Sequence, residues 1–239
     1  MISIIVPVFN EENTIEVLLK HLDQVSGTQI HELLLIDGGS TDDTLKKVND
    51  YDRHRVAQKI GAFPIKVFRS NKGRAVQMNF GANKAEADIL YFLHADSLPP
   101  KHFDEAIVTY VKDNKRAGCF RMKFDHKHWW LELMAWFTKI NHRACRGGDQ
   151  SLFVCKKVFQ EIGGYDERYV VFEDNHFIGK LYDQKIFSVI PSWVVTSSRR
   201  YQEHGVWRLQ YHFLIIYIKR WFGASGEELC AYYKEKVAK

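Results

Sequence analysis

The amino-acid sequence predicts a single α/β domain over residues 1–239, with a mostly parallel central sheet flanked by helices. Its 239 residues are 46% hydrophobic, which is enough for one substantial core. Through the first two-thirds, short apolar runs alternate with segments of helical periodicity, the pattern of a parallel sheet covered on both faces. There is no internal repeat and no long Pro/Ser/Gly linker, so we expect no domain boundary.

The chain opens with a predicted βαβα unit. The first strand is expected over residues 3–8, and the next segment has apolar residues at helical spacing: Ile15, Leu18, Leu19 and Leu22. A second strand is expected over residues 32–36. Either Ser40 or Thr41 can cap the helix that follows.

The alternation continues into the middle of the chain. We expect a third strand over residues 65–68, a helix over about 74–84 and a fully apolar, central strand over 89–93. A helical stripe then recurs at Phe103, Ala106, Ile107, Tyr110 and Val111. Residues 119–124 alternate as a further strand.

Two segments depart from this alternation. Residues 126–146 are rich in Trp, His and Arg, which indicates an insertion or a substrate subsite. Residues 207–222 mix apolar and basic side chains. They predict an amphipathic helix on a membrane surface or, alternatively, a helix that closes the core or a homodimer contact.

The charge and the cysteines narrow the class of protein. The net charge of +5 comes from dispersed Lys and Arg residues, which suits a phosphorylated small ligand better than a nucleic acid. No signal peptide is recognised, and the apolar run at residues 213–218 is far shorter than the ~20 residues of a membrane span. Four scattered cysteines indicate reduced thiols. We therefore expect a cytoplasmic protein, with peripheral membrane contact as an alternative.

Polar side chains follow three predicted strands, at the edge where open α/β sheets bind ligands. The first strand is followed by residues 10–12, the second by 37–40 and the fourth by 94–96. Asp37 is placed to accept hydrogen bonds from a nucleobase or ribose, although Asp-Gly-Gly-Ser is equally good turn chemistry. Asp96 suits Mg²⁺ or Mn²⁺, with diphosphate oxygens completing the coordination; its alternative is a turn cap.

A second acidic pair begins a predicted helix. Glu173 and Asp174 precede a buried helical stripe, and Asp174 can act as a general base if an acceptor hydroxyl comes within reach. For Glu173, simple complementation of the helix start is the alternative. Arg199 and Arg200 can clamp a diphosphate, or they form a solvated basic pair.

Six segments taken in order resemble family 2 glycosyltransferases. They are residues 6–12, 37–44, 71–83, 94–96, 148–150 and 173–174. The resemblance runs from Ser3 to about Tyr201. Residues 196–205 further resemble a bacterial subgroup of small, soluble enzymes of this family.

The resemblance implies a GT-A fold, with a nucleotide-binding half over residues 1–97 and an acceptor-binding half over 98–239. It implies sugar transfer from a nucleoside-diphosphate sugar to an acceptor hydroxyl, with inversion and with Mn²⁺ or Mg²⁺. Contacts to the donor and its cation are expected from Pro7, Val8, Phe9, Asn10, Glu12, Asp37, Gly39, Arg74, Asn79, His94, Ala95, Asp96, Arg199 and Arg200. Sugar contacts are expected from Gly148, Asp149, Gln150 and Trp130, and catalysis from Asp174 with Glu173.

One departure from the family pattern concerns the residues expected to bind the metal ion. His94 stands where the first acid of Asp-x-Asp usually stands, which leaves Asp96 as the principal ligand and makes His204 a candidate second ligand. The Gln-x-x-Arg-Trp element of processive members is absent, so a polymer synthase is disfavoured. A non-catalytic nucleotide-sugar-binding protein or a sugar nucleotidyltransferase is the alternative. The acceptor is unknown, and a lipid-linked one fits the basic C-terminal helix.

Overall fold

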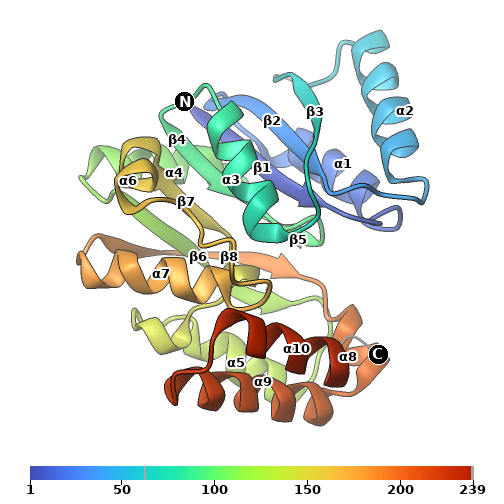
Figure 1. Cartoon of the computed structure of the whole chain (residues 1–239). Helices are drawn as coiled ribbons and strands as arrows, with labels where there is room; N and C mark the ends of the chain where they lie inside the picture. The colour runs from blue at the N-terminus through green and yellow to red at the C-terminus, as the bar shows by residue number, and fades with distance from the viewer. Residues whose placement is uncertain (62, 238–239) are drawn as a thin grey trace.

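An 8-stranded sheet in the order β3-β2-β1-β4-β7-β6-β8-β5 runs through the computed structural model, which describes residues 1–61 and 63–237 (Figure 1). The strands are β1 Ile2–Val8, β2 Ile30–Asp37, β3 Ile65–Arg69, β4 Ile89–Phe92, β5 Ser97–Leu98, β6 Ala117–Phe124, β7 Leu152–Cys155 and β8 Phe187–Thr196. The helices are α1 Ile15–Val25, α2 Thr44–Ala57, α3 Arg74–Lys84, α4 Phe103–Lys112, α5 Trp129–Phe137, α6 Lys156–Ile162, α7 Glu173–Asp183, α8 Arg199–His204, α9 Val206–Trp221 and α10 Gly226–Lys236. Two 3-10 turns, η1 Arg143–Cys145 and η2 Gly148–Gln150, precede β7.

The sheet is parallel in its first half and mixed in its second. β3, β2, β1 and β4 run parallel, and the register pairs Val8 with Asp37 and Asp37 with Arg69. The carboxyl ends of these strands therefore lie along one edge. β7 runs antiparallel to both β4 and β6, β6 pairs with β8 in parallel, and β5 is antiparallel to β8.

Alternating side chains of each strand fill two core layers. Ile4 and Val6 of β1 face α1 and α4, whereas Ile5 between them faces α3. α6 and α7 cover the same face as α3. This alternation accounts for the fully apolar strands that the sequence shows, because both faces of the sheet are buried.

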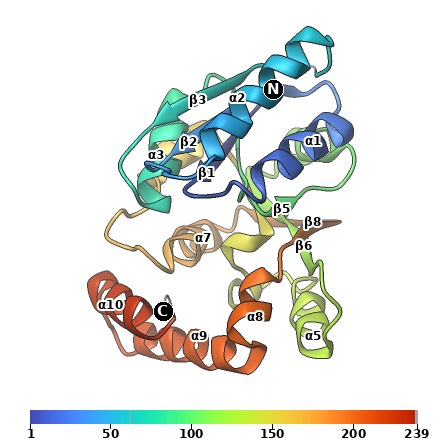
Figure 2. The ribbon, with the colours of Figure 1, turned by 90° about the vertical axis from the view of Figure 1, so that its right-hand side faces the viewer.

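A smaller third cluster holds the C-terminal helices. Tyr169 and Val171, which precede α7, pack against Ile216 of α9 and Leu229 of α10. Figures 1 and 2 place α5, α8, α9 and α10 at the end of the molecule opposite α2. These helices lie beyond the second half of the sheet rather than on the face of its parallel half.

The structure confirms the predicted strands and helices and corrects the start of one helix. α2 starts at Thr44 after Asp43, not after Ser40 or Thr41. The loop instead turns Ser40 and Thr41 toward Asn10, to which both residues are hydrogen-bonded. β8 and α10 are among the elements that were not predicted. Within the described ranges, none of the helices has the length and apolarity that a bilayer span needs.

Candidate functional site

The loop after β1 is fastened to the loop after β2. Asn10 adopts a positive φ of 56° and accepts a hydrogen bond from the Thr41 amide at 2.9 Å. The Glu12 amide donates to Asp42, and Glu12 in turn accepts from the Asp43 amide at 3.1 Å. These reciprocal bonds fix the backbone that surrounds Asp37.

Asp37 ends β2 as a fully buried carboxylate with one unsatisfied oxygen. Its Oδ1 accepts a hydrogen bond from the Ser40 amide at 2.9 Å, whereas Oδ2 has no hydrogen-bond partner. Arg69 Nε lies 3.8 Å from Oδ2. Because buried polar atoms are nearly always hydrogen-bonded, the free oxygen points to a ligand donor.

The side chain of Gln77, from α3, packs against the backbone at the ends of β1 and β2. Its Nε2 donates to the carbonyl oxygens of Val8 and Ile36, at 2.9 and 2.6 Å. A Cβ at Gly38 would lie 3.2 Å from the Gln77 side chain. Nearby, the Lys72 ammonium lies 3.6 Å from the centre of the Phe9 ring.

His94 is the hub of the acidic part of the site. Its Nδ1 lies 3.5 Å from Asp149 Oδ1, and its Nε2 lies 3.9 Å from Asp174 Oδ2. Burial lowers the pKa of His94, but the neighbouring carboxylates outweigh burial and raise the pKa above its ordinary value. The imidazole, two residues beyond the end of β4, thus lies between residues of η2 and α7.

Asp96 lies beside His94 in a group of mutually repelling acids. Burial raises the pKa of Asp96, and the charge of Asp149 raises it further. His94 and Arg199 act in the opposite direction and lower this pKa, but by less. Burial also raises the pKa of Glu11, and Asp96 adds to that shift. Arg199 Nη2 lies 3.7 Å from Glu11 Oε2, so the first residue of α8 faces this acidic group.

The turn before α7 positions the second acidic pair, Glu173 and Asp174, at the start of the helix. Phe172 precedes the helix with a φ of 74°, a strained value for a large side chain. Glu173 is buried, and its Oε1 lies 2.9 Å from Arg74 Nε. Burial raises the pKa of Glu173 to about 7, although Arg74 opposes the shift.

Gly148 allows the η2 backbone to touch Asp174. A Cβ at this position would overlap Asp174 Oδ2, and would lie 2.6 Å from Asp174 Cγ and 3.0 Å from His94 Cε1. The two separations from Asp174 are shorter than real Cβ contacts, and the one from His94 is tight. The absence of a side chain therefore fixes how closely η2, β4 and α7 can approach one another.

A cavity of about 520 Å³ opens beside this group. Its polar lining includes Arg74, Asp149, Asp174 and Arg200. Its aromatic lining comes from Phe124, Phe137, Phe172, Tyr201, Phe213, Tyr217 and Tyr233. The aromatic walls suit a ligand with an apolar surface or sugar rings.

Several predicted site residues lie together, and others are engaged elsewhere. Pro7, Val8, Ala95 and Gly39 belong to the strand ends and turns at the carboxyl edge, while Arg200 donates to the Tyr233 hydroxyl at the cavity.

Three of the expected residues make other contacts. The Asn79 amide is used by Tyr165 and Glu167. The buried Gln150 side chain bonds to Arg146 and to the Cys145 carbonyl. Trp130 packs on Trp207, 5.2 Å between ring centres, and does not line the cavity.

His204 ends α8, and no hydrogen bond or ion pair joins it to Asp96 in the described residues. Glu11 and Tyr233 are the residues that sequence reasoning missed. Glu11 stands in the same polar run as Asn10 and Glu12, which could have drawn attention to it. Tyr233 belongs to the unanticipated α10.

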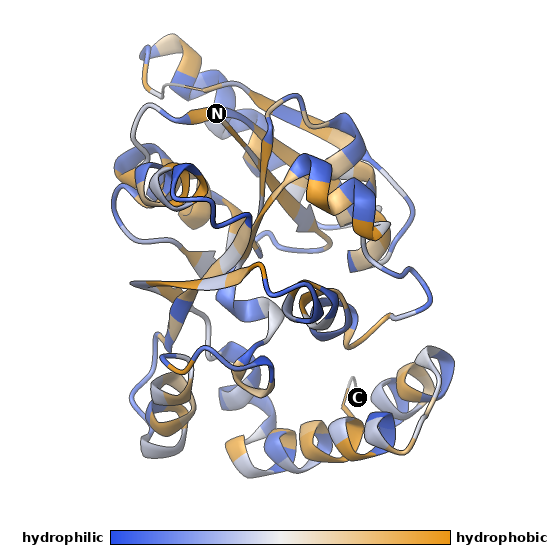
Figure 3. Cartoon of the chain, turned by 90° about the vertical axis from the view of Figure 1, so that its left-hand side faces the viewer, coloured by the Kyte–Doolittle hydropathy of each residue, from blue (hydrophilic) through white to orange (hydrophobic). Residues whose placement is uncertain are grey.

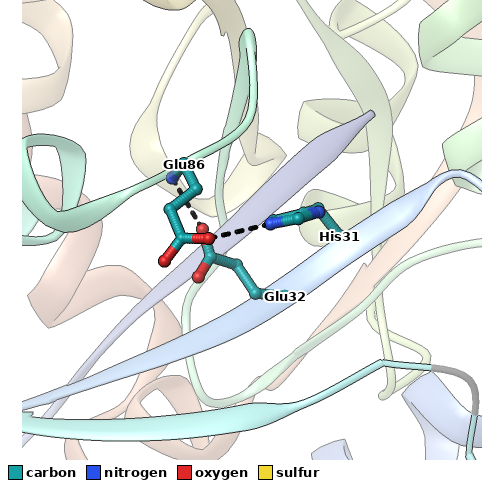
Figure 4. Close-up of side chains that lie close together, drawn as sticks. All are labelled: His31, Glu32 and Glu86. Atoms are coloured by element: carbon teal, nitrogen blue, oxygen red, sulfur yellow. Dashed lines mark hydrogen bonds and ion pairs between the residues drawn. The ribbon is translucent and has the colours of Figure 1, made fainter.

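A separate cluster of ligand-type side chains lies away from this edge. Among the residues described, the one group of three whose ligand atoms lie within 4.8 Å of one another is His31, Glu32 and Glu86 (Figure 4). The Lys66 ammonium already contacts Glu32 at 2.8 Å and Glu86 at 2.6 Å. A cation is therefore supplied by the protein itself, and the cluster is an ion-pair network.

Comparison with known proteins places these residues in context. The model of the family described as "Glycosyl transferase family 2" matches residues 3–187. Glucosyl-3-phosphoglycerate synthase of Mycobacterium tuberculosis is 32% identical over 99 residues, 41% of this chain and 30% of that protein. Undecaprenyl-phosphate 4-deoxy-4-formamido-L-arabinose transferase of Klebsiella pneumoniae is 28% identical over 133 residues, 50% of this chain and 39% of that protein. The matched segments thus span less than half the length of these curated relatives.

Two solved structures resemble the whole fold. TarS of S. aureus in complex with UDP superposes with a TM-score of 0.67 at 19% identity, over 82% of this chain and 60% of that one. The mannosyltransferase PcManGT from Pyrobaculum calidifontis, in complex with GDP-Man and Mn²⁺, also gives 0.67, at 17% identity, over 90% of this chain and 61% of that one.

Proposed function

The chain belongs to glycosyl transferase family 2 and has the GT-A fold, and on that premise we propose that it transfers a sugar from a nucleoside-diphosphate sugar to an acceptor hydroxyl. The observation that carries the proposal is the convergence on His94 of Asp149 and Asp174, beside Asp96 at the carboxyl edge of the sheet. The nucleotide of the donor is expected at the adjacent edge, around Asp37.

Donor binding is supported by the unsatisfied oxygen of Asp37. A buried carboxylate with one free acceptor can receive a hydrogen bond from a base N–H or a ribose hydroxyl. Phe9 and the 10–12 loop border the same edge. The neighbours of known structure contain UDP in one case and GDP-Man in the other, so UDP- and GDP-sugars are the first donors to test.

The acids around Asp96 fit a divalent cation. Two of them, Asp96 and Glu11, have pKa values raised by burial and by neighbouring acids, and a cation would relieve that repulsion. A Mg²⁺ or Mn²⁺ ion held by one or two carboxylates takes its remaining ligands from diphosphate oxygens and water. Asp96 would hold the ion, which would neutralise the charge of the leaving diphosphate.

Asp174 is our proposed general base. It lies at the N-terminal turn of α7 and lines the cavity in which an acceptor can bind. The acceptor oxygen forms a bond to the anomeric carbon, its proton passes to the Asp174 carboxylate, and the diphosphate leaves with the electron pair of the broken bond. One direct displacement of this kind inverts the anomeric centre. The neighbouring Arg74–Glu173 pair holds the first turn of α7 in position.

An assay of nucleotide release tests the class and the donor together. The protein is incubated with UDP-, GDP- and dTDP-sugars, with and without Mn²⁺. We expect release of nucleoside diphosphate from one donor type and dependence on the cation. Release of pyrophosphate from a sugar phosphate and a nucleoside triphosphate would instead identify a nucleotidyltransferase and reject the proposal.

A further inference from the structure

One face of α9 is apolar along its whole length and is exposed to solvent. Trp207, Tyr211, Leu214, Ile218 and Trp221 recur at helical spacing and are all exposed. Trp221 and the following Phe222 are 86% and 85% exposed. The opposite face of the helix carries Leu209 and Ile216, which are buried. The exposed stripe is therefore not the face that packs against the rest of the protein.

α5 extends the same surface. Its Trp129, Leu133 and Trp136 are exposed at helical spacing. The Trp129 ring lies 5.7 Å from that of Trp207, between ring centres, so the two stripes are joined. We call this joint surface the α5–α9 face; Figures 1 and 2 place it at the end of the molecule remote from α2, and Figure 3 shows apolar residues recurring along α9.

The exposed apolar area of the α5–α9 face is larger than single, scattered surface residues would give. Aromatic side chains present ~150–250 Å² each, so Trp207, Trp221 and Phe222 together expose on the order of 500 Å². The largest apolar patch of an ordinary monomer is roughly 300–600 Å², and the leucine, isoleucine, tyrosine and α5 residues add to the three aromatics. A binding partner is therefore expected.

The charges around the face identify the partner. α9 contains no Asp or Glu, and its Arg208 and Lys219 are exposed. Arg220 instead lies over the Tyr169 ring, 5.5 Å from its centre. Residues 126–146 carry Lys127 and Lys139 among their basic groups, against the single acid Glu132. Trp and Tyr bordered by Lys and Arg are typical of the lipid headgroup region, whereas Lys is depleted in protein interfaces. Two such basic rims facing each other would repel in a dimer.

We propose that the α5–α9 face rests on the surface of a bilayer that contains anionic lipids. The face is continuous with the cavity, because Phe137 and Tyr217 are exposed and also line it. Docking therefore brings the cavity toward the headgroups. The acceptor class that follows is a hydroxyl carried by a lipid, and only this last step rests on the proposed function.

Vesicle flotation tests the docking directly. The whole protein is mixed with vesicles of phosphatidylcholine alone or with phosphatidylglycerol, and no sugar donor is present. We expect the protein to float with the anionic vesicles and to be released by salt. The double variant Trp221→Ser, Phe222→Ser should reduce the floated fraction roughly tenfold. Val56→Ser, at an exposed residue of α2, is the matched control and should float as the wild type does.

Three results would overturn the proposal. The wild type could fail to float with anionic vesicles, or the double variant could float equally well. Light scattering could also find a dimer that the double variant converts to a monomer, which would assign the face to a second copy. Circular dichroism and calorimetric donor binding should be unchanged in the variant, which separates loss of docking from misfolding. Because flotation needs no donor, failure of sugar transfer would leave this test intact.

Discussion

Gly148 is the position where one added carbon should displace the proposed general base, Asp174. In Gly148→Ala the new Cβ would overlap Asp174 Oδ2 and stand 2.6 Å from Asp174 Cγ. Ordinary contact requires at least about 3.4 Å, so Asp174 must move by about 1 Å or more. A displacement of this size costs on the order of 10²-fold in rate. Overpacking should also lower the free energy of unfolding by about 1–3 kcal/mol.

The adjacent Gly147 provides a matched control. A Cβ there would meet no atom within 4 Å, and its φ of −162° is extended backbone that alanine adopts without strain. The assay measures kcat for donor turnover and donor affinity by calorimetry in Gly147→Ala and Gly148→Ala. We expect kcat to fall only in Gly148→Ala, with donor affinity retained in both. Equal turnover in the two variants would refute the placement of Asp174 against η2.

Three further predictions concern binding, pH and stability. Asp37→Asn should weaken donor binding roughly tenfold or more, because hydrogen bonds to charged groups contribute about 1.5–3 kcal/mol; unchanged affinity in calorimetry would exclude Asp37 from the donor site. Burial raises the Glu173 pKa from 4.5 to about 7, so folding takes up a proton in this window and the unfolding free energy falls as pH rises through it. Thermal melts of Glu173→Gln should show a smaller fall between pH 5 and pH 7, and an identical slope would contradict the shift. Ser3→Ala removes a buried 2.7 Å hydrogen bond to Glu32 and should cost about 2 kcal/mol in denaturant titration, whereas a metal chelator should leave the midpoint unchanged because Lys66 supplies the cation of that cluster.

The N-terminal half of the fold could be predicted because its signals are local. β1, β2 and β4 are apolar runs buried on both faces, and α1 has a clear apolar stripe at 3.6-residue spacing. The polar residues that end β1, β2 and β4 follow from the parallel topology, which aligns the carboxyl ends at one edge. That alone predicted the location of Asp37 and Asp96.

The second half was predicted less completely because tertiary contacts decide it. Pro191 interrupts β8, whose register to β6 shifts between Phe120 and Arg121, and a proline argues against a strand. α10 buries little more than Leu229 and Cys230, so its apolar stripe is weak, although the Ser225–Glu228 capping box could have located its start. The contact of Gly148 with Asp174 could not be predicted, because it joins segments that are distant in the chain.

The most direct test of the site is calorimetric donor binding by Asp96→Ala and Asp174→Asn, with and without Mn²⁺, beside sugar transfer by the same proteins. If both acids serve one donor and one cation, Asp96→Ala should lose the part of donor affinity that depends on Mn²⁺. Asp174→Asn should keep that affinity and lose transfer. Metal-dependent binding that survives in Asp96→Ala, or transfer at the original rate in Asp174→Asn, would contradict the assignment of these two residues.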